Sequence, residues 1–189
     1  MLATFDGEKI TLEEKRRFSN DPVNINGDLH WDVLRLFFEI KQGILKCANS
    51  GDRDIDCIGI DTWGVDYGLL DENDKLIGNP YHYRDTRTEG MYDEAFKLVP
   101  KEEIFKETGI AFNWFNTIYQ LLSAKLSGDT SLKNAKTLLM MPDLFNFFLT
   151  GVKKTEYTNA STTQMYNSEK YEWSYDLLKK PVSYTHLRA

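Results

Sequence analysis

The feature that most constrains the fold is a short apolar run that ends abruptly in polar residues. Ile55–Ile60 has the length and composition of a buried strand, and Asp61–Asp66 follows it without a break. Upstream, residues 28–48 carry apolar side chains at near-helical spacing, with Asp28 placed to cap the helix and Asn49–Gly51 placed to end it. A helix followed by a buried strand is typical of βαβ-type architecture. We therefore expect an α/β fold with the polar cluster at the carboxyl end of a strand.

The remaining sequence divides into short elements with no repeat and no interior linker, which predicts one compact α/β unit. The expected elements are strands at 2–5 and from 10 onward, a loop at 20–27, a hairpin of 68–70 with 75–78, helices at 88–98, 100–109, 117–126 and 142–151, an apolar run at 137–141 and a polar strand or loop at 155–163. The first two strands form only part of a meander, because a sheet usually needs three strands to be stable alone.

Composition excludes several classes of function. The chain has 189 residues and a formal net charge of −6, which argues against a nucleic-acid partner. No apolar run is long enough to span a membrane, and the first residues do not resemble a signal peptide, so we expect a cytoplasmic protein with no membrane partner. Cys47 and Cys57 lack the spacing of a zinc site or a disulfide framework. The sequence contains neither a GxGxxG dinucleotide fingerprint nor a P-loop.

The polar cluster itself has the composition of a sugar or polyol site. Trp63 offers a flat apolar face and one N–H donor, and Gly64 leaves room for a ligand to approach the backbone. Asp61 and Asp66 supply acceptors suited to hydroxyl groups. The competing interpretation is a twisted strand crossover that buries the tryptophan and leaves the carboxylates in solvent. Composition alone favours this structural interpretation, because short patterns are weak signals.

Two further clusters are polar enough to belong to a site. In the segment 83–88, Arg84 and Arg87 are spaced to pair with Asp85 or to bind an anionic ligand. Taken alone, this pattern favours a surface ion-pair network at the start of a helix. The second cluster, Phe115–Thr117, places Asn116 where a helix begins, and it is also explained by a helix cap.

Several motifs resemble, in the right order, the FGGY family of carbohydrate kinases, and within it the rhamnulokinases. The segment 58–71 resembles the second strand and loop of these kinases, and Tyr83–Arg87 resembles their Tyr-Arg-Asp-Ser/Thr-Arg segment. Phe115–Leu121 resembles their Phe-Asn-Thr-x-Tyr-Gln-Leu run, and Leu139–Asp143 and Glu156–Gln164 also match. The resemblance covers roughly residues 1 to 180.

This resemblance implies an actin-like, ribonuclease-H-like ATPase lobe, the N-terminal one of two lobes that enclose a cleft. The rhamnulokinase-like members use ATP and Mg²⁺ to phosphorylate the ketose L-rhamnulose at O1, in rhamnose catabolism. The residue that matches Gly64 contacts the ketose there, and Thr62 and Trp63 build the same wall. By the same resemblance, residues expected to line the cleft are Asp66, Arg84, Asp85 and Asn116.

The resemblance also implies what this stretch of chain lacks. The phosphate-binding glycine loop of the family and the strand before it do not occur here, so we expect a lobe without its first strand and Met1 to be an internal methionine. The general base and the adenosine pocket of the family belong to a C-terminal lobe, which would be a required partner. We therefore expect residues 1–180 to be an N-terminal lobe, inactive alone, with no catalytic or cofactor-binding residue of its own, and residues 181–189 to be a non-native tail. The alternative is a stand-alone sugar-binding or regulatory lobe.

Overall fold

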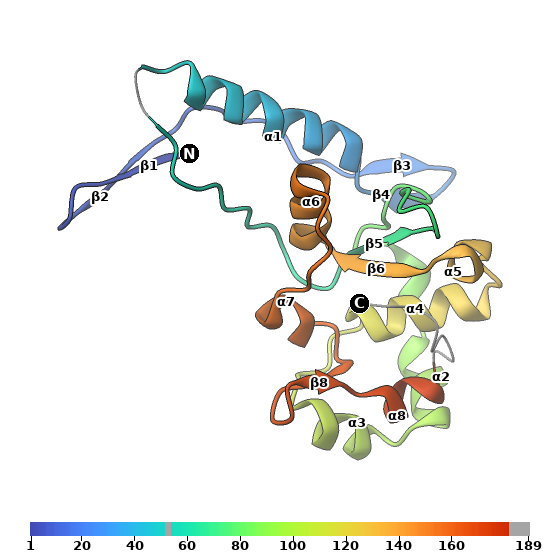
Figure 1. Cartoon of the computed structure of the whole chain (residues 1–189). Coiled ribbons are helices and arrows are strands. Elements are labelled where there is room, and N and C mark those ends of the chain that lie inside the picture. The colour runs from blue at the N-terminus through green and yellow to red at the C-terminus, as the bar shows by residue number, and fades with distance from the viewer. Residues whose placement is uncertain (52–53, 182–189) are drawn as a thin grey trace.

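A computed structural model describes residues 1–51 and 54–181. Its elements are β1 (Leu2–Phe5), β2 (Ile10–Glu13), β3 (Val23–Ile25), β4 (Asp28–His30), α1 (Val33–Ala48), β5 (Tyr67–Leu70), one turn of 3₁₀-helix (Thr86–Thr88), α2 (Met91–Leu98), α3 (Lys101–Thr108), α4 (Thr117–Leu126), α5 (Thr130–Asn134), β6 (Thr137–Met140), α6 (Met141–Thr150), α7 (Tyr157–Ser161), β7 (Tyr166–Asn167), β8 (Glu172–Trp173) and α8 (Tyr175–Lys179). Figure 1 shows α1 along one side and the helices α2 to α5 on the opposite side of β5 and β6.

The centre of the molecule is the antiparallel pair of β5 and β6, buried on both faces. Tyr67 pairs with Met140 and Leu69 with Leu138, and these side chains contact the core made by α2, α3 and α4. Because side chains alternate along a strand, Leu70 lies on the other face, packed with α1 and α6. Every residue of both strands is buried, so this pair positions the loop that precedes β5.

Three predicted helices are confirmed close to their expected ends. The helix α3 begins after Pro100 and ends at Gly109, whose positive φ suits a C-cap. The helix α4 begins at Thr117, and α6 carries Pro142 in its first turn, where the missing N–H costs no hydrogen bond. Each of these helices also buries apolar side chains in the core. Local sequence signals and packing therefore favour the same ends.

The expected start of the first long helix is wrong. The helix α1 begins at Val33 and is capped by Asp32, whose carboxylate accepts from the N–H of Arg35. Residues 28–30 form β4 instead, and they pair with β3 inside the predicted loop. The turn Asn26–Gly27 has positive φ at both residues, which favours a tight hairpin over an earlier helical turn.

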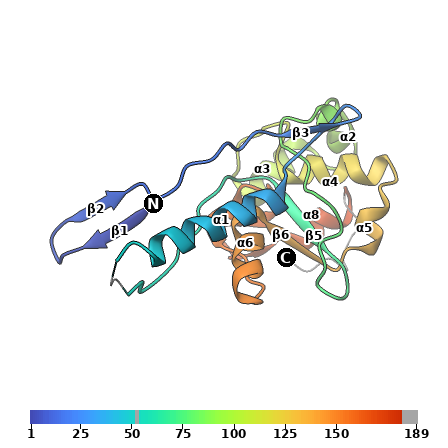
Figure 2. The same cartoon turned by 90° about the horizontal axis from the view of Figure 1, so that it is seen from above.

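The strand predicted at Ile55–Ile60 is also wrong. Residues 54–60 have no regular secondary structure, and all of them except Ile60 are exposed. Figures 1 and 2 show this stretch as an irregular trace that leads from beyond the end of α1 to β5, with the β1–β2 hairpin extending away from the rest of the molecule. A strand is stable only when neighbouring strands take its backbone hydrogen bonds, and the described residues provide no such neighbour here.

The other differences concern short elements. All four strand pairs in the described structure are antiparallel and two-stranded, so the expected βαβ unit is absent from this part of the chain. The second arm of the predicted 68–78 hairpin is reduced to a bridge between Leu70 and Leu76. The helix α2 begins after Gly90 rather than Thr88, and the polar stretch 155–163 contains α7. Glu156 caps α7 through the N–H groups of residues 158 and 159, which explains why a polar sequence forms a helix there.

Among the described residues, no helix is long and apolar enough to cross a membrane. The predicted tail begins at Pro181, the last described residue, and its remainder, 182–189, lies outside the described part of the chain.

Candidate functional site

The loop before β5 contains a strained backbone turn within the segment 58–71, which carries the first family motif. Val65 has φ of 65°, a left-handed conformation that a β-branched side chain rarely adopts. Its N–H donates to Thr162 Oγ1 at 3.0 Å, and its carbonyl accepts from Thr117 Oγ1 at 2.6 Å. Such strain persists only where the surroundings fix it, and it clusters at functional sites. The hydrogen bonds from α4 and from the end of α7 therefore hold this loop in one shape.

Gly64 lies directly against Thr162. A Cβ built at Gly64 would lie 2.9 Å from both Cγ2 and Oγ1 of that threonine, closer than real side chains approach. The contact shows a packing reason for glycine at this position, in addition to the ligand access that the sequence predicts. Because Thr162 Oγ1 also accepts from Val65, the threonine has little freedom to move away.

Asp66 is fully buried beneath the loop, where four donors converge on its carboxylate. Oδ2 accepts from the indole N–H of Trp31 at 2.6 Å and from that of Trp63 at 3.0 Å. The backbone N–H of Tyr83 completes this oxygen at 3.2 Å, and the Gln120 amide donates to Oδ1 at 2.9 Å. The carboxylate thus fixes two indoles rather than remaining open to a ligand.

Burial raises the pKa of Asp66 to about 6, although hydrogen bonds from Trp31, Gln120, Trp63 and the Tyr83 backbone favour the ionised form. Desolvation therefore outweighs the donors. The carboxylate is ionised at neutral pH and gains a proton in mildly acidic solution.

Gln120 connects the three motifs that the sequence singled out. Its amide nitrogen donates to Asp66, and its Oε1 accepts from Arg87 Nη2 at 2.7 Å. The Arg87 guanidinium lies 3.8 Å from the centre of the Tyr81 ring, a cation–π contact. One side chain from α4 therefore joins the loop at 61–66 to the segment at 81–87.

A cavity of about 460 Å³ opens beside this network. Its wall is made by the loop before β5, by Tyr83, by the segment before α4 and by the end of α7. The lining residues are Trp63, Gly64, Val65, Tyr83, Ile110, Ala111, Asn113, Phe115, Asn116, Ser161 and Thr162. Aromatic faces with a few amide and hydroxyl groups are the composition expected for a site that binds a small polar molecule.

The structure brings three of the predicted site residues to this cavity. Trp63, Gly64 and Asn116 line it. Asn116 begins α4 without capping it through its side chain. Instead its amide nitrogen donates to the carbonyl of Ala111 at 3.0 Å and to Gln164 Oε1 at 3.1 Å, which fixes the wall of the cavity.

The other four predicted residues lie outside the cavity wall. Asp66 lies beneath it, and Thr62 donates to the carbonyl of Trp63 at 3.3 Å. Asp85 is buried and accepts from the N–H groups of Leu29 and Arg87, so it caps the 3₁₀ turn and anchors β4. Arg84 is exposed, with its guanidinium 5.4 Å from the Tyr83 ring.

Sequence reasoning missed Trp31 and Thr162, which complete the site. The Trp31 ring lies against the tilted rings of Trp63 and His82, with ring centres 4.2 Å and 4.0 Å away. The sequence pattern indicated only an apolar helix position for Trp31. Thr162 lies in a motif that was noted but given no role. The only local signal for Trp31 was a tryptophan near a predicted helix cap. Its hydrogen-bond partner, Asp66, is 35 residues away in the sequence and could not be inferred from that signal.

The described residues contain no cluster of metal-binding side chains. No group of three or more His, Cys, Asp or Glu side chains in residues 1–51 and 54–181 is arranged to hold a metal. We therefore assign no Mg²⁺ ligands among these residues.

The family of the chain follows from comparison with known proteins. Residues 5–181 match the N-terminal domain of the FGGY family of carbohydrate kinases, and the chain belongs to this family.

Among curated relatives, the chain is 46% identical to a rhamnulokinase of Halalkalibacterium halodurans over 91% of its length. It is also 46% identical to a rhamnulokinase of Mannheimia succiniciproducens over 94% of its length. It spans only 37% of each of these relatives.

Solved structures confirm the fold. The chain is similar to a gluconate kinase of Lactobacillus acidophilus with a TM-score of 0.80 at 20% identity, over 90% of this chain and 35% of the kinase. A xylulose kinase of the same organism gives a TM-score of 0.78 at 21% identity, over 86% of this chain and 33% of that one. Together with the family match, this similarity confirms the expected fold, that of the N-terminal lobe of an FGGY kinase.

Proposed function

We propose that this chain is the ketose-binding part of a rhamnulokinase-like enzyme, which as a whole transfers a phosphoryl group from ATP to O1 of L-rhamnulose. The observation that carries the proposal is the identity of 46% to rhamnulokinases, combined with a cavity walled by the motif that the resemblance assigns to the ketose. The need for Mg²⁺, a C-terminal lobe and a cytoplasmic location are parts of the same proposal.

The proposed roles of the site residues follow from their positions. Trp63 supplies an apolar face for the sugar, and Asn116 supplies its amide oxygen at the same cavity, because its amide nitrogen already donates to Ala111 and Gln164. Asp66 and Asp85 act by holding this wall, because protein donors already occupy their carboxylates. Thr62 and Arg84 stay predicted contacts, which would need movement of the loop or closure by a further lobe.

The first experiment measures substrate choice. A polypeptide that carries this chain at the full length of its relatives should phosphorylate L-rhamnulose in preference to xylulose, fuculose and glycerol. A preference for glycerol would contradict the rhamnulokinase assignment.

The second experiment tests the chain alone. With Mg-ATP and L-rhamnulose, the 189-residue chain should give no turnover near 1 s⁻¹, roughly the lower end of kinase rates. Isothermal titration with L-rhamnulose should show weak binding that Gly64→Ala removes and Gly59→Ala preserves, because only the first substitution clashes with its surroundings. Tight ketose binding with no nucleotide would favour the alternative of a sugar-binding lobe.

A further inference from the structure

A second cavity, separate from the candidate site, lies between α7 and the β7–β8 hairpin. It has a volume of about 360 Å³. The lining residues are Thr155, Tyr157, Ala160, Tyr166, Tyr171, Glu172, Trp173 and Tyr175. Five of these eight are aromatic, a density far above that of an ordinary surface. No residue of this cavity lines the first one.

The rings stand at steep angles to one another and form the walls of a corner. Tyr166 and Trp173, which are paired across β7 and β8, meet edge to face, with ring centres 5.3 Å apart and planes at 89°. Tyr157 meets Tyr166 at 76°, with centres 5.7 Å apart. Tyr171 stacks on Tyr157 at 29° and extends that wall. Walls at right angles suit a compact, rounded group, whereas a flat sugar ring stacks best on one open platform.

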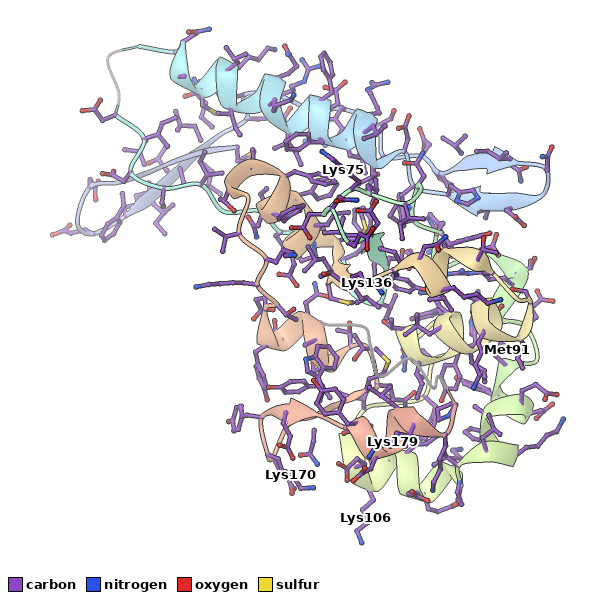
Figure 3. All side chains as sticks on the ribbon, turned by 45° about the vertical axis from the view of Figure 1, so that its right-hand side comes forward. Lys75, Met91, Lys106, Lys136, Lys170 and Lys179 are labelled. Carbon is purple, nitrogen blue, oxygen red and sulfur yellow. The ribbon has the colours of Figure 1, made fainter. Side chains whose placement is uncertain are left out.

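The charge of the cavity is acidic. Glu172 lines it and forms no ion pair with another described residue, and none of the lining residues is basic. The neighbouring Lys170 does not supply a positive charge there, because its Nζ lies 3.7 Å from Glu107 on α3. Figure 3 shows Lys170 on the side of the hairpin away from α7. The faces of aromatic rings and a carboxylate both attract cations.

We propose that this cavity binds a small organic cation with a trimethylammonium group. The ring faces would surround the methyl groups, and Glu172 would balance the charge at the rim. Recognition of quaternary ammonium by aromatic cages rests on the same chemistry. The site does not depend on the ketose cavity, so it can be tested whether or not the kinase proposal is correct.

The test uses choline as the probe and isothermal titration of the 189-residue chain. The matched control ligand is the neutral isostere of choline, in which a carbon atom replaces the quaternary nitrogen. Shape and apolar area stay constant between the two ligands, so only the charge differs. We expect choline to bind at least about twofold more tightly than the isostere, the lower limit for a partly exposed cation–π site.

Two variants locate the binding. Glu172→Gln should weaken choline binding without affecting the isostere, whereas Glu169→Gln, which removes the same charge from the same hairpin outside the cavity, should change neither. Tyr171→Gly removes an exposed ring at a residue with φ of 57°, a conformation that glycine adopts freely, so it should weaken choline without unfolding the hairpin.

Equal affinities for choline and its isostere would overturn the proposal, because binding would then be apolar only. Choline binding that Glu172→Gln and Tyr171→Gly leave unchanged would also overturn it. So would displacement of choline by L-rhamnulose at equal concentration, which would mean that the aromatic cavity is a sugar site.

Discussion

Two regions of the molecule contain short apolar segments but differ in burial. The first, which we call the N-terminal arm, consists of residues 1–18 together with residues 54–60 and is largely exposed, whereas the β5–β6 pair is buried. Leu12 on β2 is 61% exposed, whereas Leu70 on β5 is fully buried. Similar apolar content therefore gives different structures, depending on what lies against it. The β5–β6 pair is covered on both faces by helices, while Figure 2 shows the β1–β2 hairpin reaching away from the helices.

The local sequence pattern decides whether a segment can form a strand, and packing against other elements decides whether that strand becomes part of a core. Ile55–Ile60 is apolar at four of its six positions, yet it is irregular because it has no hydrogen-bonded neighbour in the described structure. Exposed apolar edges are unfavourable in water and promote association between chains. The arm is thus the part of this chain where stability is expected to be lowest.

Truncation of one leucine in each region tests the comparison most strongly. Leu70→Ala should destabilise the chain by about 2–5 kcal/mol, because it leaves a cavity between α1, α6 and the β5–β6 pair. Leu12→Ala should change the free energy of unfolding by less than about 0.5 kcal/mol, because its side chain is exposed. Urea unfolding of both variants measures the difference, and equal losses would mean that the arm is packed in solution.

Asp66→Asn tests the polar centre of the body and should cost about 3 kcal/mol, the upper end for a buried group left without its partner. An asparagine offers one acceptor and one N–H₂ group, so at least one of the four converging donors would face another donor. The control is Asp6→Asn in the exposed turn of the arm, which should have little effect.

The same pair of variants gives a pH test with a defined sign. Burial raises the pKa of Asp66 from 3.8 to about 6, so the folded chain binds this proton more tightly than the unfolded chain does. Its contribution to stability is present in full below pH 3.8 and is lost as the pH rises through about 6. Asp66→Asn should remove this slope from the free energy of unfolding between these values. Burial also raises the pKa of Asp143 to about 6, so the variant should keep the part of the slope that comes from Asp143, and an unchanged total slope would contradict the prediction.

A smaller effect is expected from Gly64→Ala, about 1–2 kcal/mol for one overpacked methyl group. Combining it with Thr162→Ser should restore part of the loss, because Cγ2 of Thr162 is one of the atoms in the clash. Gly59→Ala in the arm is the control, since a Cβ there meets nothing within 4 Å. A cost at Gly59 equal to that at Gly64 would show that flexibility, and not contact with Thr162, explains both.

Sequence reasoning was most successful where local signals and packing agree. The helix α3, between Pro100 and Gly109, was predicted from its flanking residues, and Trp63, Gly64 and Asn116 line one cavity, although their role in binding stays a prediction. The ligand for that cavity stays a prediction.

The failures come from contacts between distant residues. Asp66 was predicted to face the ligand, but its carboxylate is occupied by Trp31 and Gln120, which lie 35 and 54 residues away. A short motif cannot show whether its carboxylates are free, because that depends on which donors the fold brings to them. The start of α1 failed for the same reason, since β4 is held by Asp85.

The smallest effect on stability is expected at Glu39 on α1, which connects the N-terminal arm to the rest of the chain. Its buried carboxylate accepts from Arg35 Nε at 2.8 Å and from Arg16, which lies in the arm. Burial is the largest single influence and opposes ionisation, but the hydrogen bonds and the charges of the two arginines together outweigh it and lower the pKa of Glu39. Its contribution is therefore present above pH 4.5 and is lost as the pH falls through the lowered value, opposite in sign to that of Asp66.

Glu39→Gln should therefore release the arm while leaving the body intact. At neutral pH, hydrogen exchange should become faster in residues 10–18 and unchanged in β5 and β6, and added salt should reduce the difference between the variant and the parent chain. Lowering the pH below the pKa of Glu39 should reproduce the effect in the parent chain. Faster exchange in β5 and β6 as well would contradict this expectation. It would mean that the N-terminal arm and the β5–β6 core unfold together, and that the ion pair between Glu39 and Arg16 stabilises both.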